Sequence, residues 1–202
     1  MLDKIILTKA KPNLVKIAKY WLDKGITPNQ MTIVGFILGL LALPIIAIEY
    51  YIYGLILIML NRVCDGIDGT MARLSSSSDR GAFLDIVLDF LFYSAIPLGF
   101  AIANPTQNAL PAAVLIYAFI GTGCSFLAFA VIAAKRNLSS TAYPEKGFYY
   151  LGGLTEATET IAVFILMCLL PEYFALLAYG FAALCFLTTA LRIKAGWDSF
   201  KD

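Results

Sequence analysis

The chain has 202 residues, the length of one ordinary domain, but 60% of them are hydrophobic and only 14% are charged, against about 25% charged in soluble globular proteins, so the composition predicts a membrane protein. The 15 lysines and arginines nearly balance the 14 aspartates and glutamates, which argues against a nucleic-acid partner because no strong overall field would attract one. The sequence contains no histidine, which excludes catalytic triads, zinc sites and proton shuttles that need imidazole and leaves acid–base and metal chemistry to carboxylates.

Residues 1–25 predict an amphipathic helix that lies along the membrane surface. Between Lys11 and Lys24, apolar side chains recur at helical spacing on one side of the helix, and Gly25 is a residue that commonly ends one. The segment is too charged, and its apolar stretch too weak, for a cleavable signal peptide. The apolar side chains expected to share this face are Leu14, Ile17, Ala18 and Trp21.

Residues 31–193 predict a bundle of six membrane-spanning helices. A span needs about 20 predominantly apolar residues, and such stretches recur between turns rich in polar residues and proline, beginning with the helix-start signal Thr27-Pro28-Asn29. We therefore expect an all-α integral membrane protein in which residues 1–202 form a single domain. The expected spans are Met31–Ile48, Tyr51–Leu74, Gly81–Ala103, Ala109–Ala134, Tyr149–Leu170 and Tyr173–Ile193.

The basic residues predict the orientation of this bundle, because cytoplasmic loops collect lysine and arginine. The three turns near residues 49–50, 104–106 and 171–172 contain neither residue. Both termini are therefore expected in the cytoplasm, in a multi-pass protein of a bacterial inner or plasma membrane. The basic residues assigned to the cytoplasmic side are those from Lys4 to Lys24, Arg73, Arg80, Lys135, Arg136, Lys146, Arg192, Lys194 and Lys201.

Four aspartates lie inside two spans that are otherwise apolar: Asp65, Asp68, Asp85 and Asp89. An ionised carboxylate at membrane depth costs at least about 2.5–3.5 kcal/mol, so four together need a counter-charge. Each pair occupies one helix face, because its members are three or four residues apart. A short turn near Ser77 makes the two helices antiparallel neighbours and brings the pairs to similar depths. We expect the four carboxylates to line one cavity that opens to the cytoplasm.

Oxygen ligands without histidine or cysteine favour hard cations such as Mg²⁺, Mn²⁺ or Ca²⁺. Four carboxylates can hold two such ions, an arrangement suited to displacement at phosphorus. Gly69, Ala72 and Gly81 lie on the same helix faces and would leave room for a bulky ligand, although close helix packing explains small residues equally well. Arg73, one turn beyond Gly69, could hold a phosphate or simply extend to the membrane surface.

The order of these residues resembles the signature of the CDP-alcohol phosphotransferases, also called CDP-alcohol phosphatidyltransferases, which are integral membrane enzymes of phospholipid synthesis. It reads Asp65-x-x-Asp68-Gly69-x-x-Ala72-Arg73, seven residues, and then Gly81-x-x-x-Asp85-x-x-x-Asp89. The resemblance implies a homodimer with a two-metal active site. It implies that Asp65, Asp68, Asp85 and Asp89 bind two divalent cations, Mg²⁺ or Mn²⁺, and that Asp89 is also the catalytic base. It further implies that the cytidine diphosphate is surrounded by Asp68, Gly69, Ala72, Arg73 and Gly81.

The reaction implied by this resemblance transfers a phosphatidyl group from CDP-diacylglycerol to the hydroxyl of a small polar alcohol and releases CMP. A related branch instead joins a CDP-amino alcohol to diacylglycerol, but the short six-span chain resembles the first branch more. A divalent-cation or proton-coupled transporter is the alternative, since intramembrane carboxylates also line ion paths. The position of all four aspartates near one side, without an inverted repeat, argues against it.

The sequence does not choose between two classes of acceptor alcohol, a phosphorylated alcohol and an amino alcohol. Lys135 and Arg136 could bind the phosphate of glycerol 3-phosphate, whereas Glu156 would favour an amino alcohol such as serine. Branches of the family with phosphorylated acceptors resemble one another in having basic residues near the start of the fifth span. This chain has Ala157 and Thr160 there, which weakens an inositol-phosphate acceptor.

Overall fold

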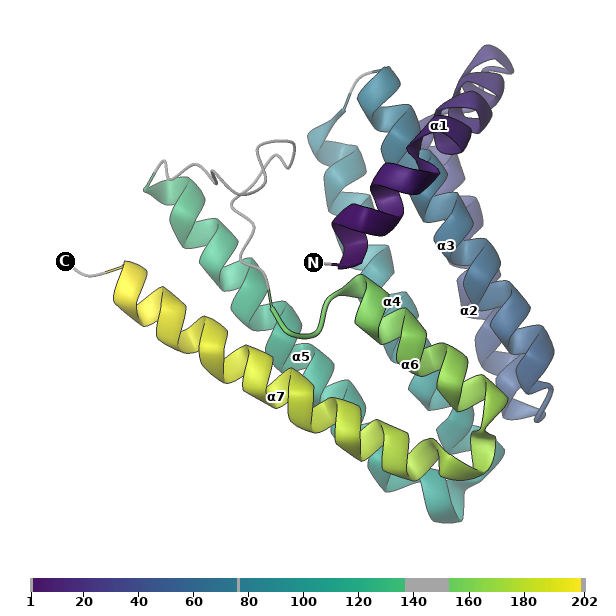
Figure 1. The fold of residues 1–202 in the computed structure, drawn as a ribbon, viewed down its shortest axis with the longest axis vertical. Coiled ribbons are helices and arrows are strands. Elements are labelled where there is room, and N and C mark those ends of the chain that lie inside the picture. The colour runs from purple at the N-terminus through teal and green to yellow at the C-terminus, as the bar shows by residue number, and fades with distance from the viewer. Residues whose placement is uncertain (1, 76, 137–152, 201–202) are drawn as a thin grey trace.

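The computed structural model describes residues 2–75, 77–136 and 153–200, and all regular elements in these ranges are helices. This confirms the all-helical prediction (Figure 1). Four of the described segments are long and apolar enough to cross a membrane, namely α2, α4, α5 and the stretch Pro171–Ser199. The helices are α1 (Leu2–Asp23), α2 (Pro28–Ala47), α3 (Tyr51–Leu74), α4 (Asp79–Ala103), α5 (Pro105–Lys135), α6 (Ala157–Leu169), the 3₁₀ turn η1 (Pro171–Tyr173) and α7 (Phe174–Ser199).

The helix boundaries follow local side-chain chemistry. Thr27 caps α2, because its Oγ1 accepts a hydrogen bond from the backbone N–H of Gln30 at 3.3 Å while its own N–H donates to Gln30 Oε1 at 2.9 Å. Asn104 separates α4 from α5, and its Oδ1 accepts from the N–H of Gln107 at 3.2 Å. The helix start predicted at residues 27–29 and the break predicted at residues 104–105 are both confirmed.

The fifth expected span begins later than the sequence suggested. Residues 149–152 lie outside the described residues, and residues 153–156 are not helical, so α6 has only 13 residues. Two contacts explain the late start. The backbone N–H of Glu156 donates to Glu159 Oε2 at 3.1 Å, which caps the helix, and the Thr155 hydroxyl donates to Thr188 Oγ1 of α7 at 3.0 Å. The prediction that this span begins at Tyr149 was therefore wrong for residues 153–156.

The helix α1 lies across one end of the bundle, against α3 (Figure 1). Ala18 is buried in a small cluster with Ile67 and Met71 of α3. Ile17 and Trp21 instead remain 40% and 37% exposed. The helix therefore packs on α3 with one side and exposes Ile17 and Trp21, and its position along a membrane surface stays a prediction. Gly25, with φ of +79°, ends the segment as expected.

The carboxylate helices α3 and α4 are both packed against α2, while α5 packs against α4 and α7. Glycines let α2 approach closely. The Asn61 amide of α3 donates to the carbonyl of Gly35 at 2.9 Å, and a Cβ placed on Gly39 would lie only 2.6 Å from the Phe92 ring of α4. The helices α3 and α4 themselves meet mainly through side chains. They are therefore less closely paired than the short turn between them predicts, and space remains between their polar faces.

Candidate active site

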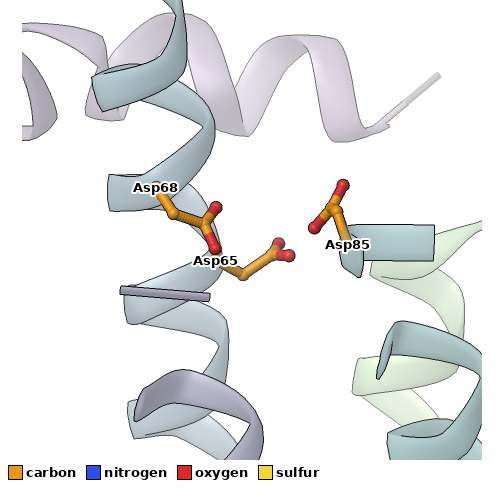
Figure 2. Close-up of side chains that lie close together, drawn as sticks. All are labelled: Asp65, Asp68 and Asp85. Carbon is orange, nitrogen blue, oxygen red and sulfur yellow. The ribbon is translucent and has the colours of Figure 1, made fainter. Parts of the chain in front are cut away.

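Three of the four intramembrane carboxylates converge. Asp65 and Asp68 of α3 and Asp85 of α4 each offer an oxygen, and these oxygens all lie within 4.8 Å of one another. Figure 2 shows the two α3 side chains directed across the gap toward Asp85. Asp68 is the most enclosed, with 5% of its surface exposed. Because hard cations bind carboxylate oxygens at about 2.0–2.6 Å, three acidic oxygens at this spacing fit the ligand set of Mg²⁺ or Mn²⁺.

The fourth carboxylate, Asp89, has a different partner. Its Oδ1 accepts a hydrogen bond from the Arg62 guanidinium at 2.8 Å. The same guanidinium lies 3.5 Å from Asp65 Oδ2. Arg62 therefore supplies part of the counter-charge that the sequence argument assigned to metal ions. Sequence reasoning missed it, although an arginine inside an apolar span, three residues before Asp65, is a usable signal.

All five residues predicted to surround the cytidine diphosphate line one cleft of about 620 Å³. The cleft lies between the first turn of α4, the last turns of α3 and the connection from α1 to α2. Thr27 of that connection and Asn29 of the first turn of α2 also line the cleft, and sequence reasoning included neither. The five predicted residues are Asp68, Gly69, Ala72, Arg73 and Gly81.

The two glycines of this cleft serve different purposes. A Cβ on Gly69 would meet only Arg73 Nη1, at 3.5 Å, so this position leaves room on the cleft side. A Cβ on Gly81 would lie 2.8 Å from Asn29 Oδ1, so this glycine permits close approach of the start of α2. The ligand and packing interpretations of the small residues therefore both apply, each at its own position.

A second cavity, of about 240 Å³, lies on the other side of the carboxylates. Asp85 and Asp89 line one wall, and Glu156 and Thr160 of the α6 start line another. Arg192 of α7 also lines it, is only 8% exposed, and donates to the Thr122 carbonyl at 3.0 Å. The sequence argument used Arg192 only as a marker of the cytoplasmic side.

The three residues predicted to bind the acceptor do not lie together. Glu156 lines the second cavity. Lys135 is the exposed last residue of α5, and neither it nor its neighbour is among the described residues that line this cavity. The Arg136 guanidinium instead donates to the Phe200 carbonyl at 3.1 Å and lies over the Phe200 ring. In the described part of the chain, the basic residue that lines the second cavity is Arg192.

Asp85 connects the two spaces, because it lines both the cleft and the second cavity. A polar ligand in the cleft and another in the second cavity would thus meet at the carboxylate cluster. This arrangement, inside a bundle of apolar helices, is that of a membrane-embedded transferase with two substrates.

The comparisons with known proteins agree with this class. Residues 25–191 match the family model described as CDP-alcohol phosphatidyltransferase. The chain therefore belongs to the CDP-alcohol phosphatidyltransferase family, and it is a membrane-bound phosphatidyltransferase of phospholipid biosynthesis.

Three relatives illustrate the range of similarity. The chain is 50% identical over 202 residues to the inner membrane protein YnjF of Escherichia coli K12, covering 100% of this chain and 98% of the relative. It is 30% identical over 154 residues to the phosphatidylinositol phosphate synthase of Corynebacterium glutamicum, covering 73% and 64% of the two chains. It is 37% identical over 105 residues to the archaetidylinositol phosphate synthase of Pyrococcus horikoshii, covering 52% and 55%.

Solved structures share the fold. The phosphatidylinositol phosphate synthase PgsA1 of Mycobacterium tuberculosis, in complex with manganese and citrate, matches with a TM-score of 0.67 and 21% identity, over 91% of this chain and 88% of that one. The same enzyme with CDP-DAG bound matches with a TM-score of 0.66 over 91% and 93% of the two chains. At this level of identity the likeness concerns the fold.

Proposed function

We propose that the protein transfers a phosphatidyl group from CDP-diacylglycerol to the hydroxyl of a small polar alcohol and releases CMP. The observation that carries this proposal is the position of Asp85, which lines both the cleft and the second cavity. The donor would place its cytidine diphosphate in the cleft, with its acyl chains directed toward lipid. The acceptor would enter the second cavity, beside Asp89. A relative with CDP-DAG bound supports this choice of donor.

The chain's own residues divide the reaction between the two spaces. Gly69 leaves room for the nucleotide, and Arg73, in the last turn of α3, is placed to contact a phosphate. Asp89 faces the acceptor cavity, where it would take the proton of the attacking hydroxyl. The acceptor oxygen then bonds to the phosphorus distal to cytidine, the bond from that phosphorus to the bridging oxygen breaks, and CMP leaves.

We propose that two divalent cations, Mg²⁺ or Mn²⁺, are held by the four aspartates. When bound, they would neutralise the diphosphate and stabilise the leaving group. The convergence of Asp65, Asp68 and Asp85 within 4.8 Å supports one such site directly. A relative crystallised with manganese supports the choice of ion. Asp89, held by Arg62, lies within one turn of Asp85 and would complete the ligand set.

We propose an acceptor that carries an anionic group, because Arg192 is the basic side chain that lines the second cavity. The phosphate of glycerol 3-phosphate and the carboxylate of serine both meet this requirement. Two of the relatives are named for inositol phosphate products, so an inositol phosphate belongs in the same test. Thr122 and Thr160 line this cavity as well; their hydroxyls donate to the carbonyls of Phe119 and Glu156 and would be left to accept a hydrogen bond from an alcohol.

The proposed placement in the membrane has both termini and the cleft on the cytoplasmic side of a bacterial inner membrane, with six spans and with α1 along the surface. The name of the YnjF relative and the apolar α2, α4, α5 and Pro171–Ser199 segments support a multi-pass inner membrane protein. The homodimer implied by the family remains a prediction.

The test is CMP release by the purified protein from CDP-diacylglycerol with Mg²⁺ or Mn²⁺ and a panel of acceptors. The panel contains glycerol 3-phosphate, serine, inositol phosphate, inositol, choline and ethanolamine. We expect release with one of the first three and none after chelation of the metal. The Asp89→Asn protein should remain folded by size-exclusion chromatography but release no CMP. Cation flux in proteoliposomes without CMP release would instead favour the transporter alternative, which none of the relatives named above supports.

A further inference from the structure

Arg62 lies among the intramembrane carboxylates. Its guanidinium is 2.8 Å from Asp89 Oδ1 and 3.5 Å from Asp65 Oδ2. It therefore contacts one carboxylate of the three-aspartate cluster and the one carboxylate outside it. Arg62 also lines the small cavity that these aspartates enclose. An arginine in this place is costly at membrane depth unless the surrounding groups compensate its charge.

The Arg62 side chain is fixed on several sides. Its Nε donates to Asn61 Oδ1 at 2.7 Å, and its Nη1 donates to the Tyr93 hydroxyl at 3.1 Å. The guanidinium carbon lies 4.6 Å from the centre of the Phe92 ring, a distance typical of a cation–π contact. Asn61 in turn is anchored to the α2 backbone. With 13% of the side chain exposed, the guanidinium has a defined position relative to α2, α3 and α4.

The contacts of Arg62 place Asp89 on the acceptor side. Asp89 and Tyr93, which both accept a hydrogen bond from Arg62, also line the second cavity. The hydrogen bond from Arg62 uses Oδ1 of Asp89, which leaves Oδ2 to meet a ligand in that cavity. Asp65, on the other side of Arg62, belongs to the cluster with Asp68 and Asp85.

We propose that Arg62 is a positioning residue that fixes the orientation of Asp89 relative to the cluster of Asp65, Asp68 and Asp85. It holds Asp89 toward the acceptor cavity, and its charge limits how tightly the cluster of Asp65, Asp68 and Asp85 binds a divalent cation. This role rests on the proposed function, because the reaction defines which carboxylate must face the acceptor. Cation binding in the absence of substrate nevertheless tests the role of Arg62 independently of the reaction.

Removal of the positive charge should change metal binding and turnover in opposite directions. Arg62→Gln keeps an amide donor but deletes a cation next to Asp65, which strengthens the attraction between the cluster and a divalent ion. It also frees Asp89 Oδ1 from its ion pair with Arg62, so that both oxygens of this carboxylate could turn toward a cation. Turnover should fall, because the base no longer faces the acceptor. A purely structural role for Arg62 would instead weaken both properties together.

The experiment measures Mn²⁺ binding by electron paramagnetic resonance in detergent, without substrate, and CMP release in parallel. For Arg62→Gln we expect Mn²⁺ affinity to rise about tenfold and kcat to fall roughly thirtyfold or more. The KM for CDP-diacylglycerol should stay within about threefold, because Arg62 does not line the cleft. Arg62→Lys keeps the charge but cannot make all the contacts of the guanidinium, so it should bind Mn²⁺ like the unmodified protein and still lose kcat.

Arg80→Gln is the matched control. Arg80 is an exposed arginine in the first turn of α4, outside the residues that line the cavities described above, and its substitution should change neither quantity. Unchanged or weaker Mn²⁺ binding by Arg62→Gln would overturn the proposal, as would full turnover in this variant. If Arg62→Gln does not fold, the Arg62→Lys protein provides the test. An altered Mn²⁺ affinity or an undiminished kcat in Arg62→Lys would contradict the proposal. Failure of the unmodified protein to release CMP contradicts the proposed function instead.

Discussion

At the scale of single residues, Arg192 is the side chain that would select an anionic acceptor in the proposed function, since it lines the second cavity. The guanidinium is almost fully buried, is held by the Thr122 carbonyl, and lies over the Phe126 ring at 5.5 Å. A buried cation that is fixed in this way is an effective partner for a phosphate or a carboxylate. The location of Arg192 in this cavity could not be inferred from the sequence. The positive-inside pattern places every basic residue near a cytoplasmic helix end on the same side of the membrane and does not show which of them lines a cavity.

Arg192→Gln should therefore weaken acceptor binding selectively. Loss of a charge-assisted hydrogen bond costs about 1.5–3 kcal/mol, which corresponds to a rise of roughly tenfold or more in the acceptor KM. The KM for CDP-diacylglycerol should change little, because Arg192 lies outside the cleft. Steady-state kinetics with each substrate varied in turn checks this. Arg136→Gln is the comparison, since Arg136 contacts Phe200 rather than the cavity. A larger acceptor KM in Arg136→Gln than in Arg192→Gln would restore the assignment made from sequence.

At the scale of helices, the sequence was informative wherever the signal is local. The spacing of the four aspartates predicted that they line one cavity between two neighbouring helices, and all four do line one small cavity, in which Asp65, Asp68 and Asp85 lie closest together. The pairing of Asp89 with Arg62 was not predictable in the same way, because it joins residues 27 positions apart and depends on how far α2 separates the two helices. The late start of α6 similarly depends on a contact between Thr155 and Thr188 of α7.

The close packing of α2 against α3 and α4 gives a prediction at this scale. Gly39→Ala should destabilise the protein by about 1–3 kcal/mol, because the added Cβ would lie 2.6 Å from the Phe92 ring and 2.9 Å from Asn61 Nδ2. Gly180→Ala is the control, since a Cβ there meets nothing within 4 Å and alanine favours a helix by about 1 kcal/mol. Thermal unfolding in detergent should show a lower Tm for the first variant and an equal or higher Tm for the second. Equal melting temperatures for Gly39→Ala and the unmodified protein would show that α2 is free to move.

At the scale of the whole molecule, near-zero net charge conceals a separation of charges. Intramembrane aspartates and Arg62 form the centre between α3 and α4. Basic residues lie near one end of the bundle, with Arg73 near the end of α3, Arg80 near the start of α4 and Lys135 at the end of α5. The cleft opens at this same end, beside the turn between α3 and α4. The charge pattern therefore predicts one orientation for the protein and the cleft together, in which the two proposed substrates would reach the carboxylates from the cytoplasm.

This orientation predicts which turns are accessible from each side of the membrane. Ser77→Cys, in the turn between α3 and α4, should react with a membrane-impermeant maleimide only when the cytoplasmic face is exposed, because the basic end of the bundle stays inside. Thr106→Cys, at the start of α5 and near the opposite end, should react from the outside of intact cells. Both positions are exposed, and the unmodified chain measures the background from its own cysteines. Labelling of Ser77→Cys in intact cells would reverse the topology and place the cleft, with its nucleotide, on the outer face.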